Sequence, residues 1–129
     1  MRYTLPTQRQ ILFTWDVKPA AKIVALILQD WADKRMGHMS DKEYNHMPES
    51  EQKEHDAEQR QDAKITVSIR KLAEIANASQ GGINSALDEL QGKGFVESDR
   101  PMKGKDGNDR KAYRYRLHQG KPAFFKTYL

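Results

Sequence analysis

A long polar and acidic stretch in the middle of the chain limits what this sequence can fold into. Between residues 38 and 64, only Met39, Tyr44, Met47 and two alanines interrupt charged and polar residues, and no apolar stripe of helical spacing is present. Such a segment has too little apolar surface to join a core. We therefore expect an acidic insertion at about 38–64, solvated and either mobile or helical, with the core built from the segments on either side.

The charge distribution follows the same division. Residues 1–35 have a net charge of +3 and residues 65–129 a net charge of +5, whereas residues 36–64 carry −4. The whole chain of 129 residues has a net charge of +4. This length predicts a single domain, 1–129. The basic parts either meet an anionic partner or only keep the chain in solution.

Composition excludes several classes of protein. The chain has no cysteine, so disulfide scaffolds, cysteine–zinc sites and thiol catalysis are impossible. The longest apolar run, Ile23–Leu28, is far shorter than the roughly 20 residues that span a bilayer. The first residues lack the apolar region of a signal peptide. A soluble, cytoplasmic protein without membrane contact is the expectation.

The first apolar segment predicts one long helix at about 19–36. Residues 11–15 read as a short strand or an apolar lead-in, Pro19 suits a first helical position, and Gly37 suits a C-terminal stop. Positions 20, 24, 27, 28 and 31 form one apolar stripe. Ile23 and Leu26 widen it beyond what one core face needs. This helix is therefore either central to the core or shared with a partner subunit.

After the polar stretch, the pattern predicts strand, helix, turn, helix and strand. Residues 65–67 suit a strand, and Ser68 and Ser79 suit the N-caps of two short helices. Asn77 ends the first helix, and glycines end the second. The two helices are thus joined by a turn of only a few residues.

A basic β-hairpin and an apolar tail follow. Residues 95–98 predict one strand, and alternating apolar residues and arginines over 113–117 predict another, with turn residues over 100–110 between them. The aromatic C-terminal tail, 119–129, is too apolar to stay free and is expected to dock. The fold class is mainly α with a small β-hairpin.

This order of elements resembles the winged helix-turn-helix family. The stretch SIRKLAEIA at 68–76 looks like the first helix of that motif, SQGGINSALDEL at 79–90 like its recognition helix, and KGFV at 93–96 like the exit into the wing. The long helix at about 19–36 is similar to the first helix of such domains, especially in phage and plasmid replication proteins and MarR-like regulators. The motif core covers 65–117.

The resemblance implies a sequence-specific double-stranded DNA-binding protein that acts in plasmid or phage replication initiation or in transcriptional regulation. The alternative is a winged-helix protein–protein interaction module without DNA binding, because a fold does not fix a function. A small metal-dependent nuclease is a third hypothesis. It would need His38, His46 and His55 to converge with acidic residues, and their spacing disfavours a metal site. No catalytic residue, metal or cofactor is expected, so the chain is not expected to be an enzyme.

The second motif helix also suits DNA on physical grounds. Ile83, Leu87 and Leu90 would anchor it on the core and turn its other face toward a major groove. Gln and Asn can pair with adenine edges, and glycines near the helix N-terminus permit close approach of a phosphate. Asp88 either accepts from a cytosine or lies just off the groove.

Cations of the hairpin would contact phosphates, although a solvated hairpin is the simpler interpretation of any charge run. The candidate DNA-binding residues are Arg70, Lys71, Ser79, Gln80, Gly81, Gly82, Asn84, Ser85, Asp88, Arg100, Lys103, Lys105, Arg110, Lys111, Arg114 and Arg116.

A homodimer is expected, held by the first long helix and both terminal segments. The apolar stretches at 11–15, 23–28 and 124–129 offer more surface than one small core needs, and large apolar patches usually mark interfaces. A twofold dimer would present two recognition helices to half-sites about 34–36 Å apart. The alternative is that both ends complete the core of a monomer.

Overall fold

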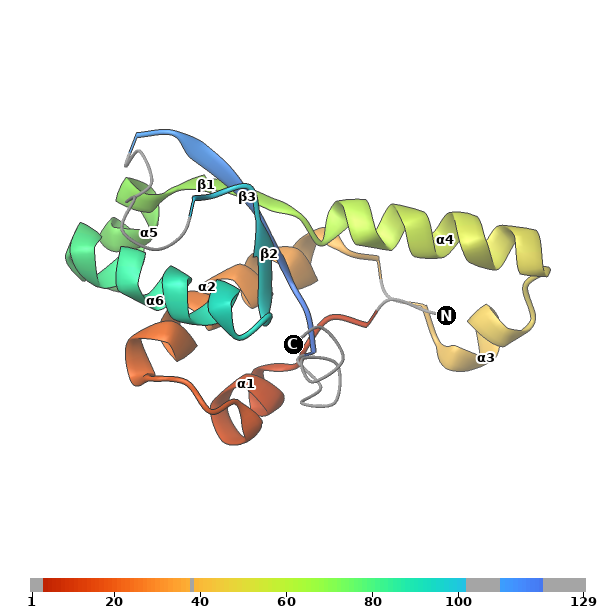
Figure 1. Cartoon of the computed structure of the whole chain (residues 1–129). Helices are drawn as coiled ribbons and strands as arrows, with labels where there is room; N and C mark the ends of the chain where they lie inside the picture. The colour runs from red at the N-terminus through yellow and green to blue at the C-terminus, as the bar shows by residue number, and fades with distance from the viewer. Residues whose placement is uncertain (1–3, 38, 102–109, 120–129) are drawn as a thin grey trace.

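The computed structural model describes residues 4–37, 39–101 and 110–119, and this part of the chain is mainly helical with a small antiparallel sheet (Figure 1). The sequence predicted this fold class. The elements run in the order α1 Gln8–Thr14, α2 Pro19–Arg35, α3 Asp41–Asn45, α4 Glu49–Asp62, β1 Ile65–Ser68, α5 Ile69–Ala76, α6 Gln80–Gly92, β2 Val96–Ser98 and β3 Ala112–Leu117.

The first element is a helix, so the strand considered for residues 11–15 is wrong. The Thr7 hydroxyl accepts a hydrogen bond from the Gln10 backbone N–H at 3.1 Å, and the Gln10 side chain accepts from the Thr7 N–H at 2.8 Å. This reciprocal cap starts a helix where the apolar residues alone resembled a strand. Ile11 and Trp15 are buried, and the Trp15 ring stacks on Phe95 with centroids 4.1 Å apart. This part of the N-terminal segment therefore completes the core of its own chain.

α2 starts at Pro19, as predicted, and ends one residue before its C-cap, Met36. Its buried stripe differs from the predicted one. The buried apolar positions are Ala21, Val24, Ala25, Leu28 and Ala32, whereas position 20 is exposed and positions 27 and 31 are only half-buried. Three alanines on the inner stripe let α6 pack closely against α2, which leaves larger side chains of α2 on the outside.

α5 and α6 form the predicted pair of short helices. The hydroxyl of Ser68 caps α5 and that of Ser79 caps α6, each by accepting from the backbone N–H three residues later. Asn77 adopts the left-handed conformation (φ 52°), and the Ala78 N–H donates to the Ala73 carbonyl at 3.0 Å. Asn tolerates this conformation better than most residues, so it allows the sharp turn between the helices.

The three strands form an antiparallel sheet in the order β1-β3-β2. Tyr113, Tyr115 and Leu117 of the central strand are buried, which confirms the predicted alternation. The predicted hairpin tip between β2 and β3, with Lys103 and Lys105, lies outside the described residues. Residues 120–129 of the predicted tail also lie outside them.

α3 and α4 extend away from the other elements as an arm, defined here as residues 39–63 (Figure 1). None of residues 39–62 belongs to the hydrophobic core. The two ends of the arm are tied together. The Gln59 side chain donates to the Gly37 carbonyl at 2.9 Å, and Arg35 Nη1 donates to the Lys64 carbonyl at 2.8 Å. The insertion thus leaves and rejoins the rest of the fold at one place.

Within residues 4–37, 39–101 and 110–119, no helix combines the length and apolar character needed to cross a membrane.

Candidate nucleic-acid interface

The N-terminal turn of α6 lies at the surface. Ser79, Gln80, Gly81 and Ser85 are exposed. A Cβ built on Gly81 would have nothing within 4 Å, whereas one on Gly82 would lie 3.1 Å from the Ser79 hydroxyl. Backbone N–H groups at the start of a helix point outward with a positive partial charge. This turn can therefore accept a close approach by an anionic or polar group.

The outward face of α6 is narrower than predicted, because Asn84 is buried. Its side chain is 6% exposed and bonds within the protein, so the expectation that it faces a base edge is wrong. Asn84 Nδ2 donates to the Gln80 carbonyl at 3.2 Å, and Oδ1 accepts from Arg100 at 2.8 Å. α6 packs on α2, α5 and β2, and this leaves only one side of the helix to solvent.

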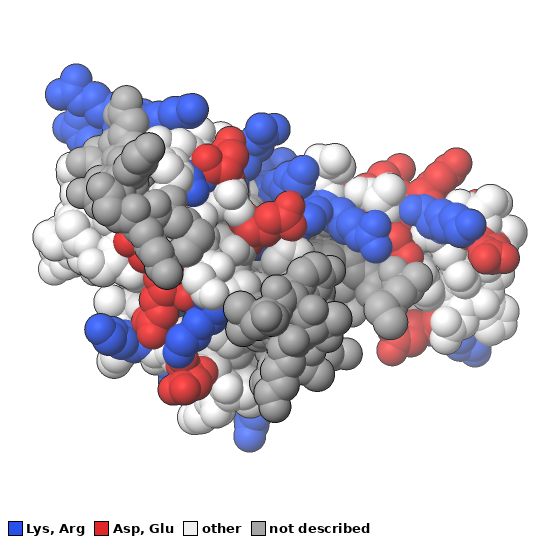
Figure 2. Space-filling view, viewed as in Figure 1, with Lys and Arg blue, Asp and Glu red and all other residues white. Residues whose placement is uncertain are grey.

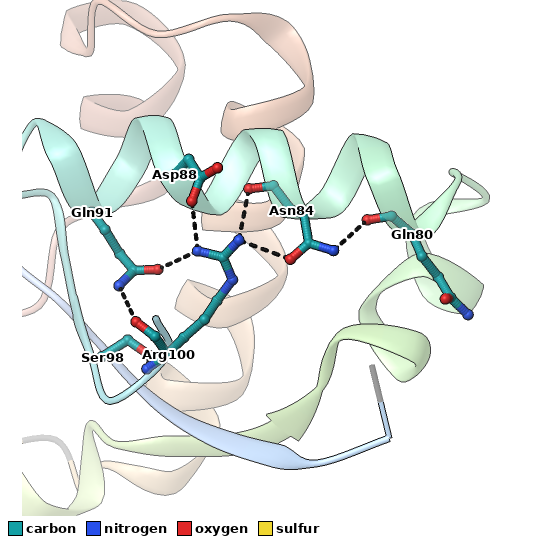
Figure 3. A network of polar contacts seen from close by, with 6 residues as sticks. All are labelled: Gln80, Asn84, Asp88, Gln91, Ser98 and Arg100. Atoms are coloured by element: carbon teal, nitrogen blue, oxygen red, sulfur yellow. Dashed lines mark hydrogen bonds and ion pairs between the residues drawn. The ribbon is translucent and has the colours of Figure 1, made fainter. Parts of the chain in front are cut away.

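Arg100 explains the burial of Asn84. The sequence suggested an exposed cation at the base of the hairpin, but the residue is 3% exposed. Nη1 donates to Asp88 Oδ1 at 2.8 Å and to Gln91 Oε1 at 2.9 Å, and Nη2 donates to both Asn84 oxygens (Figure 3). The guanidinium therefore joins the segment after β2 to three residues of α6 and is not available to a phosphate.

The backbone of Arg100 is held as well. Its N–H donates to Ser98 Oγ at 3.0 Å, and its carbonyl accepts from Gln91 at 3.1 Å. Asp88 remains one-third exposed, but its charge is matched by the guanidinium. Sequence reasoning missed this network. The sequence feature that indicates it is the spacing of Asn84, Asp88 and Gln91, which places three polar residues on one side of the helix.

The arginines on the outer side of the sheet are also paired. Arg114 lies 3.6 Å from Asp99, and Arg116 lies 2.6 Å from Glu97, which His118 also contacts at 2.9 Å. Burial alone would raise the pKa of Glu97, but hydrogen bonds from Arg116 and His118 outweigh it and lower the pKa. Blue and red groups accordingly adjoin one another on the face drawn in Figure 2. These two arginines offer an anion less net charge than the sequence suggested.

Four other cations gather where β1 ends and β3 begins. Ser68 pairs with Ala112 across the sheet, which brings Arg70 and Lys71 of α5 to the same end as Arg110 and Lys111. We call these four residues the basic end. All four are exposed. Glu74 lies 3.9 Å from Arg70 and 3.8 Å from Lys71, and the Lys111 ammonium lies 5.3 Å from the centre of the Tyr113 ring.

The predicted site residues thus fall into separate groups. The turn at the start of α6 and the basic end lie at opposite ends of α5, whose eight residues span about 12 Å. α6 itself contains no Lys or Arg, and it carries Asp88 and Glu89. The described residues therefore present two neighbouring features and not one continuous positive face.

The histidines of the arm have local contacts. His46 Nδ1 lies 2.7 Å from the Lys42 carbonyl, and the His55 ring lies 5.8 Å from that of Tyr44. No group of three His, Asp or Glu side chains in the described part of the chain is placed to hold a metal ion.

Comparison with known proteins adds no relative. No protein-family model, no curated protein and no solved structure matches the chain. What the chain does must therefore be inferred from its own residues and their geometry.

Proposed function

We propose that the chain is a winged helix-turn-helix protein that binds double-stranded DNA sequence-specifically and acts in plasmid or phage replication initiation or in transcriptional regulation. The observation that carries the proposal is the exposed first turn of α6, presented just after a tight turn from α5. A major groove about 12 Å wide admits one helix, and the end of a helix without bulky side chains can approach it closely.

In this proposal, the first two turns of α6 contact DNA through Gln80, Gly81 and Ser85. Gln80 would pair with an adenine edge, and Ser85 with either kind of base. The backbone of Gly81, with open space in place of a side chain, would lie against a phosphate or base. Asn84 supports this surface through Arg100 and does not read bases itself.

In this proposal, phosphate contacts are made by the basic end, together with Lys103 and Lys105 of the hairpin tip that the sequence predicts. A winged helix places cations of this kind beside the recognition helix, where they contact the DNA backbone and set the register. Arg114 and Arg116 contribute less, because each lies close to its own carboxylate, at 3.6 and 2.6 Å. Arg70 and Lys71 instead share the single carboxylate of Glu74, at 3.9 and 3.8 Å, which leaves them a net positive charge.

Salt dependence tests the phosphate contacts. If the four cations of the basic end and the two lysines Lys103 and Lys105 each neutralise a phosphate, the logarithm of the binding constant should fall with the logarithm of salt concentration with a slope of about −5. Fluorescence anisotropy with a duplex selected from random sequence measures this slope. Lys71→Ala should reduce its magnitude by about one, whereas Lys53→Ala, an exposed cation on the arm, should leave it unchanged. A flat salt response would contradict the phosphate contacts.

Sequence preference tests the helix. Gln80→Ala and Ser85→Ala should reduce discrimination between duplexes more than Lys103→Ala or Lys105→Ala does, because base contacts specify and phosphate contacts position. Gly81→Ala is the sharpest variant, since its methyl group meets no atom of the protein within 4 Å. It should weaken DNA binding without lowering the melting temperature. The proposal fails if only the lysine variants change the preferred sequence.

A protein–protein interaction module without DNA binding is the second candidate. The pairing of the sheet arginines and the lack of cations on α6 favour it. If no duplex from a random pool binds at low salt, this second candidate replaces the first.

The predicted homodimer belongs to the same proposal, since two copies would present two α6 helices to a twofold target site.

A further inference from the structure

The outer side of α2 is an apolar surface that no described part of the chain covers. Together with Ile75 of α5 it forms a shallow groove of about 290 Å³. Ile23 is 47% exposed and Ile75 is 43% exposed. The groove is lined by Ile23, Leu26, Ile27, Asp30, Trp31 and Ile75.

The groove results from the way α2 divides its side chains. Alanines, Val24 and Leu28 form the buried stripe, and the other large apolar residues of α2 lie on two outer rows of i, i+4 spacing. One row contains Ile23, Ile27 and Trp31. The other reads Lys22, Leu26, Asp30 and Lys34. The outer side of α2 therefore has an apolar strip beside a row in which Leu26 lies between Lys22 on one side and the ion pair of Asp30 and Lys34 on the other.

We propose that a second copy of the chain covers this groove, with α2 packed antiparallel on the partner's α2 about a twofold axis near Leu26. This deepens the proposed homodimer by naming its surface. It rests on the shape and charge of α2, and it can be tested without DNA.

Charge complementarity favours a second copy in this orientation. Lys22 lies one turn before Leu26 and Asp30 one turn after it, each about 6 Å along the helix axis. A twofold axis at Leu26 places Lys22 opposite the partner's Asp30, and Asp30 opposite the partner's Lys22. A parallel pair would instead set like charges against each other.

Both groups can enter such a pair. The Lys22 ammonium donates one hydrogen bond, to the Leu12 carbonyl at 2.8 Å, and has two further protons. Asp30 lies 3.0 Å from Lys34 on the surface, and its side chain is 46% exposed. A carboxylate accepts several bonds, so the partner's Lys22 adds to this contact without displacing Lys34.

Sedimentation equilibrium of the full chain at micromolar concentration tests the surface. The wild-type chain should be a dimer, and Ile23→Glu should be a monomer. Phe13→Glu is the matched control, because Phe13 is 75% exposed on α1 and does not line the groove. It should leave the dimer intact. A monomeric wild-type chain, or equal effects of the two variants, would overturn the proposal.

Charge reversal tests the antiparallel register. Lys22→Glu and Asp30→Lys should each raise the dimer dissociation constant roughly tenfold, because each sets like charges across the axis. The double variant should restore the wild-type constant. Thermal melting of each variant shows whether the monomer remains folded. If the folded double variant stays as weak as the single ones, the register is wrong.

DNA binding separates this inference from the proposed function. A monomeric Ile23→Glu chain should still bind one half-site, though more weakly than the dimer binds two. A dimer that is lost in Ile23→Glu, combined with no DNA binding by the wild-type chain, would support the surface and contradict the DNA proposal.

Discussion

At the scale of single residues, Arg100 shows why a count of cations gives an incomplete account of a site. In the sequence it belongs to a basic cluster with Arg114 and Arg116. In the fold its guanidinium is enclosed by three residues of α6. Whether an arginine meets solvent or an internal carboxylate depends on contacts between segments far apart in the chain. Single-residue patterns do not contain that information.

Arg100→Ala should lower the free energy of unfolding by about 2–3 kcal/mol. The loss stays below that of a fully buried ion pair because Asp88 is one-third exposed and regains water. Urea denaturation measures it. Arg114→Ala is the matched control, since its ion pair is exposed, and it should cost less than about 1 kcal/mol. Equal losses would show that the buried network contributes nothing beyond a surface pair.

Gly94 matters for a different reason, because the backbone conformation at this position favours glycine. Gly94 lies just after the end of α6 and has a φ of 77°, and the N–H of the next residue, Phe95, donates to the Leu90 carbonyl at 2.9 Å. Gly94→Ala should therefore destabilise the protein by about 1–2 kcal/mol. Gly37→Ala should be nearly neutral, because its added methyl group meets nothing within 4 Å. Thermal denaturation of the two variants measures this difference: the melting temperature should fall for Gly94→Ala and stay nearly unchanged for Gly37→Ala.

At the scale of helices and strands, local signals predicted much of the fold. The N-caps Ser68 and Ser79 lie where the sequence placed them, and the alternation of Tyr113 and Tyr115 with arginines predicted the central strand. Two features were wrong. α1 resembled a strand because its cap depends on Gln10 reaching back to Thr7, and the buried stripe of α2 is set by how closely α6 approaches. In α1 a local cap, and in α2 tertiary packing, overrides what the order of apolar residues suggests.

Acid should loosen the pair of strands β2 and β3. The pKa of Glu97 is lowered as described above, and a backbone hydrogen bond from Arg114 lowers that of Asp99. The unfolded chain then takes up protons first, near the ordinary pKa values of 4.5 and 3.8. Stability is thus fully present above these values and falls as pH drops through the lowered native values.

Urea denaturation at several pH values between about 3 and 7 measures this loss. Because both carboxylates are largely exposed, each should change the free energy of unfolding by less than about 1 kcal/mol. Glu97→Gln should flatten the curve. Glu54→Gln, on the exposed surface of the arm, should not. A curve that Glu97→Gln leaves unchanged would contradict this role.

At the scale of the whole molecule, the arm stands apart from the core. Because Gln59 and Arg35 tie its ends together, a short loop can replace residues 40–62 with little strain. The shortened chain should keep its cooperative thermal unfolding. Ile11→Ala, at a fully buried position, should instead lower the free energy of unfolding by about 2–5 kcal/mol. Loss of cooperativity in the deletion would show that the arm supports the core.

The strand order β1-β3-β2 also determines when the fold can be completed. The central strand is the last of the three to be synthesised, so β1 has no sheet partner while α5 and α6 are being made, and β2 has none until β3 follows it. Helices can form early from local contacts, whereas pairing β1 with β3 must close a long loop. On the ribosome, the two helices of the motif are thus expected to form before the sheet that supports them. A nascent chain that stalls before Ala112 would expose two short strands whose partner in the described sheet, β3, is still missing.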